Sequence, residues 1–106
     1  MPKELKRIRE GRFFATGEDG CSEVWAGPLS GHRLVVALWN RCSEVATITA
    51  PWTTIGLESG IQVSVRDLWQ HKVVTTDAVS SFSARVNAHD SHLYIFTPAT
   101  TSYSVQ

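Results

Sequence analysis

A chain of 106 residues, 42% of them hydrophobic and 19% charged, is long enough for one globular domain and too short for a (β/α)₈ barrel, which needs about 250 residues. Ten Lys and Arg balance ten Asp and Glu, so the chain has no overall attraction to nucleic acid or to an anionic membrane. No apolar run approaches the roughly 18 residues of a membrane span, and the first residues contain no signal-peptide core, so we expect neither a membrane nor a nucleic-acid partner.

The start of the chain is basic. Half of all its Lys and Arg residues lie within the first twelve positions. Leu5 and Ile8 have the spacing of one helical face, but so short an amphipathic helix is marginal in water. We therefore predict that residues 1–18 form a basic tail, either poorly ordered or a short helix, rather than an arm that binds nucleic acid.

From Gly17 onward, short β segments alternate with turn residues. A turn around Ser30 and Gly31 joins two predicted strands into a hairpin, and the second of them is apolar on both faces, as in a central strand. Because the sequence predicts almost no helix, its fold class is all-β: an antiparallel β-sandwich with Greek-key connections over residues 19–98, followed by a polar tail at 99–106. The predicted strands are residues 23–29, 33–41, 44–52, 61–71, 73–76, 80–88 and 93–97.

The segment 61–71 has the clearest strand pattern. Its apolar row runs through Val63 and Val65 to Asp67 and Trp69, with polar residues between them. A carboxylate in a buried row is costly when it is unpaired, so Asp67 must find donors or lie where the strand ends.

The two cysteines can be placed on the predicted hairpin. If it turns at residues 30–32, residues whose numbers sum to about 62 face one another, and Cys21 lies nearly opposite Cys42. A disulfide there would add about 3 kcal/mol of stability in an oxidising compartment. Two free thiols are the alternative that the sequence leaves open.

Residues that could carry catalysis or bind a metal are present but poorly arranged. His89 and His92 are three apart, so on a strand they point to opposite faces and do not readily share an ion. The serines lack the elbow motif of a serine hydrolase, and Asp67 and Asp90 fit strand-end anchors better than a pair of glycosidase carboxylates. We expect no catalytic residue, no metal and no cofactor.

Four tryptophans remain as candidate binding residues. Exposed tryptophan faces stack on sugar rings, whereas tryptophans in strands more often pack in the core with a bonded N–H. We expect three of the four to be structural. Trp52, beside Pro51 in a predicted turn, is expected to be the most exposed, and with Trp25 it is our candidate for sugar binding.

Six segments of the chain, running on to Tyr94 and to Thr97 and Pro98, form a recognisable pattern: residues 25–29, 35–41, 48–50, 55–57, 65–71 and 88–90. Together they resemble the C-terminal domain of plant-type α-galactosidases, glycoside hydrolase family 27. The resemblance covers residues 21–98, in the same order and spacing. It implies a β-sandwich packed behind a (β/α)₈ barrel, whose two aspartates remove terminal α-galactose with retention; no position here matches the motifs of those aspartates.

By this resemblance the chain is a non-catalytic domain whose partner is an absent barrel, in a parent enzyme that is secreted or located in the cell wall or vacuole. Galactosides are its candidate ligands. The resemblance also implies structural anchors: Asp67 accepts backbone N–H groups and fixes the turn at Trp69, His89 bonds across to a neighbouring strand, and Trp39 packs. The alternatives are a stand-alone carbohydrate-binding module that uses exposed tryptophans and an immunoglobulin-type interaction domain.

Overall fold

The computed structural model describes residues 2–7, 13–17, 19–58 and 60–99. Within these ranges the chain forms strands and turns, and none of it is helical. Accordingly, this part of the chain offers no helix of the length and apolarity needed to cross a membrane.

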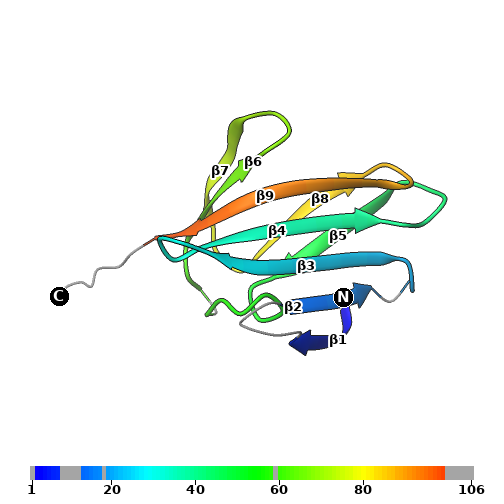
Figure 1. The fold of residues 1–106 in the computed structure, drawn as a ribbon, viewed down its shortest axis with the longest axis horizontal. Coiled ribbons are helices and arrows are strands. Elements are labelled where there is room, and N and C mark those ends of the chain that lie inside the picture. The colour runs from blue at the N-terminus through cyan, green and yellow to red at the C-terminus, as the bar shows by residue number, and fades with distance from the viewer. Residues whose placement is uncertain (1, 8–12, 18, 59, 100–106) are drawn as a thin grey trace.

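The strands form two antiparallel sheets, a large one with the order β1-β2-β3-β4-β9-β6-β7 and a small one of β5 and β8 (Figure 1). The chain passes repeatedly between the sheets, since β5 and β8 each lie between strands of the large sheet in sequence. The predicted all-β antiparallel sandwich is therefore confirmed. The strands are β1 (Pro2–Arg7), β2 (Phe13–Gly17), β3 (Ser22–Leu29), β4 (Arg33–Asn40), β5 (Ala46–Pro51), β6 (Val63–Asp67), β7 (Lys72–Ala78), β8 (Ser81–Val86) and β9 (Asp90–Pro98).

The β3–β4 hairpin has the predicted register. Trp25 faces Ala37 and Ser22 faces Asn40, so paired residue numbers sum to 62 along the whole hairpin. Strand β4 lies in the middle of the large sheet, with β3 on one side and β9 on the other. The strand predicted at residues 73–76 is β7, which forms one edge of the large sheet.

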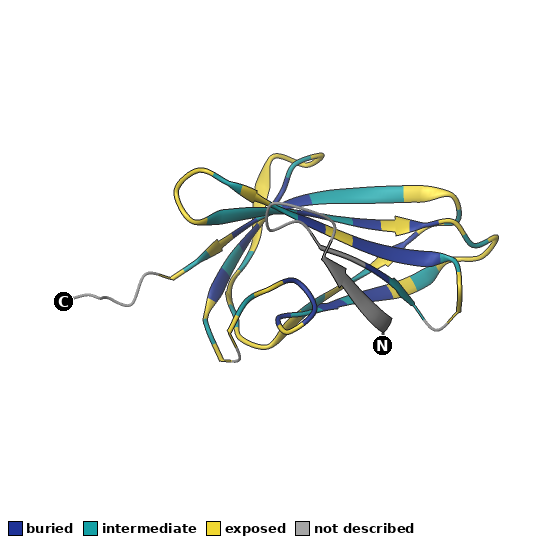
Figure 2. Ribbon diagram, turned by 60° about the horizontal axis from the view of Figure 1, so that its bottom comes forward, coloured by how far each residue is buried: buried dark blue, intermediate teal, exposed yellow. Residues whose placement is uncertain are grey.

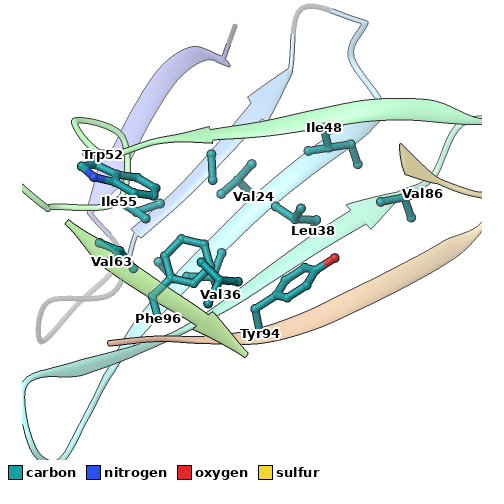
Figure 3. Packing of buried hydrophobic residues seen from close by; sticks show 13 residues of the cluster. Val24, Val36, Leu38, Ile48, Trp52, Ile55, Val63, Val86, Tyr94 and Phe96 are labelled. Atoms are coloured by element: carbon teal, nitrogen blue, oxygen red, sulfur yellow. The ribbon is translucent and has the colours of Figure 1, made fainter. Parts of the chain in front are cut away.

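The core lies between the two sheets and is built from alternate residues of the strands (Figure 2). Its centre is aromatic: Trp52 meets Phe96 edge to face at 5.6 Å between ring centroids (Figure 3). Phe82 contacts Phe96 in the same way, with 5.7 Å between the ring centroids. The small sheet contributes Ile48 from β5 and Val86 from β8. Because successive side chains on a strand point to opposite sides, the large sheet has a second face directed away from this core.

The first strands differ from the sequence prediction. Pro2–Arg7 and Phe13–Gly17 are strands, so the prediction of a helix or a poorly ordered tail is wrong for these residues. Strand β2 pairs with β3, which supplies partners to backbone groups that an edge strand would leave unpaired. Residues 8–12 of the predicted basic tail, and residues 100–106 of the predicted polar tail, lie outside the described residues.

A disulfide joins Cys21 and Cys42 at the open end of the β3–β4 hairpin, with their Cα atoms 5.2 Å apart. The bridge lies just beyond the last strand pair, Ser22 and Asn40, where the Arg41 N–H donates to the Cys21 carbonyl at 3.1 Å. The hairpin is thus closed covalently at one end and by its turn at the other.

Removing this bridge is expected to lower the free energy of unfolding by about 3 kcal/mol, because the unfolded chain regains the freedom of a loop of about 20 residues. Denaturant unfolding of the wild type and of the double variant Cys21→Ser/Cys42→Ser, each with and without a phosphine reductant, measures the loss. The reductant should bring the wild type to the midpoint of the variant and leave the variant unchanged. Equal midpoints for the oxidised and reduced wild type would contradict the bridge.

Candidate functional site

The tryptophans divide differently from the prediction. Trp52 is 1% exposed, and its indole N–H donates to the Ile61 carbonyl at 2.8 Å, so the expectation that it is the most exposed is wrong. It follows β5 directly, and the ring therefore enters the space between the sheets (Figure 3). Trp25, Trp39 and Trp69 are 39%, 41% and 61% exposed. Three of the four tryptophans are thus accessible, where we expected three to be structural.

Two of the accessible tryptophans lie on the face of the large sheet that points away from the core, which we call the outer face. It is formed by the outward residues of β3, β4 and β9. A groove of about 440 Å³ opens on it, and the lining carries almost no polar side-chain atoms. The residues that line it are Trp25, Ala26, Gly27, Pro28, Leu29, Val35, Ala37 and Leu93.

A charged residue beside the groove is buried although it lies on the outer face. Glu23 is 5% exposed, and both of its carboxylate oxygens are bonded. Its Oε1 accepts the Trp25 indole N–H at 2.9 Å, and its Oε2 accepts Arg41 Nη1 in an ion pair. The Arg41 guanidinium also lies 5.6 Å from the centroid of the Trp39 ring, within cation–π range. Glu23 therefore bonds Trp25 directly and is connected to Trp39 through Arg41.

The sequence contained a signal for the outer face that we interpreted only in part. Both faces of residues 33–41 are apolar, which predicted that both would be covered. One face of β4 meets the core, whereas on the other face Val35 and Ala37 line the open groove. The sequence did not indicate that Glu23 is buried. Its burial depends on Trp25, Trp39 and Arg41, which the pairing of β3 with β4 brings close to it.

The third accessible tryptophan follows β6, which ends at Asp67. The Asp67 side chain is 6% exposed, and its Oδ1 accepts the backbone N–H groups of Trp69 at 2.8 Å and Gln70 at 3.0 Å. The indole N–H of Trp69 donates to the Ser91 carbonyl at 3.1 Å. Asp67 thus lies at the end of a strand with its Oδ1 bonded, as the sequence required. Trp69 is exposed, although the alternation of residues 61–71 placed it in the buried row.

His89 does not make the bond that we expected. It lies in the turn between β8 and β9 with a φ of 60°, and within the described part of the chain its side chain has no hydrogen-bond partner. The turn is closed instead by the backbone, where the Asp90 N–H donates to the Asn87 carbonyl at 3.1 Å. The expectation of a cross-strand bond from His89 is therefore wrong.

Among the residues that the structure describes, one grouping of metal-ligand residue types is present, in which the Asp19 carboxylate lies within 4.8 Å of the Cys21 and Cys42 sulfurs. Metals bind thiolates, and these sulfurs are joined to each other. Hydrogen bonds from the backbone N–H groups of Ser22 and Cys21 hold the pKa of Asp19 below its usual value. The Asp19 carboxylate therefore stabilises the turn before β3 by accepting these two backbone N–H groups.

Comparison with known families finds that residues 19–96 match the α-galactosidase C-terminal β-sandwich domain. The chain belongs to this family. It is 67% identical over 93 residues to α-galactosidase 3 of Arabidopsis thaliana, a match that covers 88% of this chain and 21% of that protein. The chain therefore spans about a fifth of this relative's length.

Solved structures agree with the assignment to the α-galactosidase sandwich family. The structure of α-galactosidase I from Mortierella vinacea superimposes with a TM-score of 0.71 and 29% identity, covering 78% of this chain and 22% of that one. An isomalto-dextranase from Arthrobacter globiformis superimposes with a TM-score of 0.60 and 35% identity, covering 72% of this chain and 12% of that one. The family resemblance drawn from the sequence is confirmed.

In this α-galactosidase sandwich, truncating Asp67 to Ala is expected to cost about 1–3 kcal/mol of stability, because two backbone N–H groups lose their acceptor. Asp67→Asn keeps an oxygen at the same position and should cost less. Urea unfolding of the two variants measures the difference. An Asp67→Ala variant as stable as the wild type would refute a structural role for this carboxylate.

Tyr94 makes the stability of the sandwich sensitive to high pH. Burial, and then the charge of Asp67, raise the pKa of Tyr94 from 10.0 to about 12. The folded chain therefore keeps this proton where the unfolded chain loses it, so the stabilisation is complete below about pH 10 and is lost as the pH rises to about 12. Thermal unfolding between pH 9 and 12 should show this fall, and the Tyr94→Phe variant should show a shallower one. Identical slopes would contradict the assignment.

Proposed function

We propose that this chain is the accessory sandwich of an α-galactosidase and that its outer face packs against the catalytic (β/α)₈ barrel. The observation that carries the proposal is the second apolar face of β4, which a central strand needs covered and which here lies open beside Trp25. Because the chain spans 21% of the length of its Arabidopsis relative, the part of such an enzyme that would cover this face lies outside the chain.

The acids of the sandwich support a non-catalytic role. Glu23 is held by Trp25 and Arg41, Asp67 by the turn after β6, and Asp19 by the turn before β3. A retaining glycosidase needs two carboxyl groups about 5 Å apart across an open cleft, one of them free to attack the sugar. Carboxylates already bonded to their own chain do not fit this task, so the hydrolysis of α-galactosides is assigned to the barrel.

Galactoside binding by the sandwich itself is the second candidate. The observation that favours it is Trp69, the most exposed of the large hydrophobic residues whose side chains the structure describes, with its indole N–H fixed on Ser91 so that the ring is held in one orientation. Against a galactose-specific site stands the similarity of this sandwich to one in a protein named isomalto-dextranase, since the two names refer to different sugars.

The proposal is tested in a chimera of Arabidopsis α-galactosidase 3 in which this chain replaces the 93 matching residues. The chimera should hydrolyse an aryl α-galactoside and survive heating much longer than the enzyme truncated before that region, because the sandwich covers apolar surface of the barrel. The isolated chain should show no hydrolysis. A chimera no more stable than the truncated enzyme, or hydrolysis by the isolated chain, would overturn the proposal.

The isolated chain also serves to test the second candidate function, galactoside binding. If the isolated chain binds galactosides through Trp69, its tryptophan fluorescence should change on titration with galactose, and the Trp69→Ala variant should not respond. Unchanged fluorescence at millimolar galactose would count against sugar binding.

A further inference from the structure

We infer that the outer-face groove is a socket for a ridge of apolar side chains on one helix of the catalytic barrel, and that Glu23 positions the tryptophan that forms its wall. The inference deepens the proposed function and rests on it, because the barrel supplies the helix. The outside of a (β/α)₈ barrel is a ring of helices, so a domain that packs there meets helical surface.

The strand register places small residues along the floor of the groove and large side chains on both sides of it. On β4, the small Ala37 lies between Trp25 of β3 and Leu93 of β9, which are its partners on either side. Next to it on β3, Gly27 adds no side chain at all. Side chains four residues apart on a helix form a ridge, and a ridge packs into a groove of this kind.

The chemistry of the lining favours an apolar occupant over a sugar. Sites for polar ligands present a few convergent hydrogen-bonding groups among their apolar residues. The groove is lined by aliphatic side chains, a proline, a glycine and Trp25, whose indole N–H is already donated to Glu23. Sugar hydroxyl groups would lose their bonds to water here without replacement, whereas an apolar ridge has none to lose.

Glu23 holds the Trp25 ring, which forms the wall of the socket, in place before the barrel helix binds. A carboxylate with 5% exposure is stable only because both of its oxygens are paired, and one of the two pairs fixes the Trp25 ring. Fixing a large side chain in advance removes part of the entropy cost of association, and buried tryptophans are frequent sources of binding energy at interfaces. Glu23 is thus a positioning residue, which acts through Trp25 rather than by touching the barrel.

The floor of the socket is tested by filling it. In the α-galactosidase 3 chimera, Ala37→Phe should shorten the half-life of activity at elevated temperature about tenfold or more, toward the value of the truncated enzyme. The matched control is Thr47→Phe, which places the same ring at an exposed position on β5 in the other sheet and should leave the half-life unchanged. Denaturant midpoints of the two isolated chains should agree with that of the wild type, because both positions point away from the core.

The positioning role is tested by Glu23→Ala and Glu23→Gln in the same chimera. Glu23→Ala should weaken docking and so shorten the half-life of activity at elevated temperature. Glu23→Gln should restore most of that half-life, because an amide oxygen can still accept the Trp25 N–H although the charge is gone. If Ala37→Phe behaves like Thr47→Phe while the wild-type chimera is stabilised, the socket and the packing of the barrel on this groove are wrong, whereas the role of the chain as an accessory sandwich stands. If Glu23→Gln fails to restore docking, the role of Glu23 is wrong. A wild-type chimera without added stability removes the proposed function and the socket together.

Discussion

The pairing of β3 with β4 is the constraint on which the rest of this sandwich depends. Its register sends Val24, Ala26, Val36 and Leu38 toward the small sheet and Trp25 and Ala37 the other way. The same register brings Cys21 and Cys42 within bonding reach beyond the last strand pair. A slip of one residue would exchange the two faces and separate the cysteines. The core, the groove and the disulfide therefore all depend on this one register.

The outer face shows how a domain can be stable and still incomplete. The core between the sheets is closed by aromatic contacts around Phe96, and a covalent bridge holds the hairpin. These contacts lie between the sheets and at the hairpin end, so none of them involves the groove. An apolar surface that the fold itself does not need is a cost in water, and such surfaces mark places where another protein surface packs. Buried Glu23 fits this view, because its bonds order a side chain that the core does not use.

Sequence reasoning succeeded where local rules decide the outcome. Two-residue periodicity and turn residues located β3 to β9 and the central position of β4, and the turn at Ser30 and Gly31 set the cysteine pairing. It failed where distant segments decide. Residues 1–18 were interpreted from their charge, yet Phe13–Gly17 are a strand because β3 offers them an edge. Trp52 was placed outside because Pro51 suggested a turn, and the turn instead carries the ring between the sheets.

The sequence by itself determined the family, the order of strands β3 to β9 along the chain, the hairpin register and the absence of the barrel's aspartate motifs, because each of these follows from residue identity and spacing. Only the tertiary structure decided which tryptophans are accessible, that Glu23 is buried and bonded to Trp25 and Arg41, and that a groove opens over Ala37. Exposure and side-chain pairing depend on which strands become neighbours and on which face of the sheet is covered, and neither is a property of any one segment of the sequence.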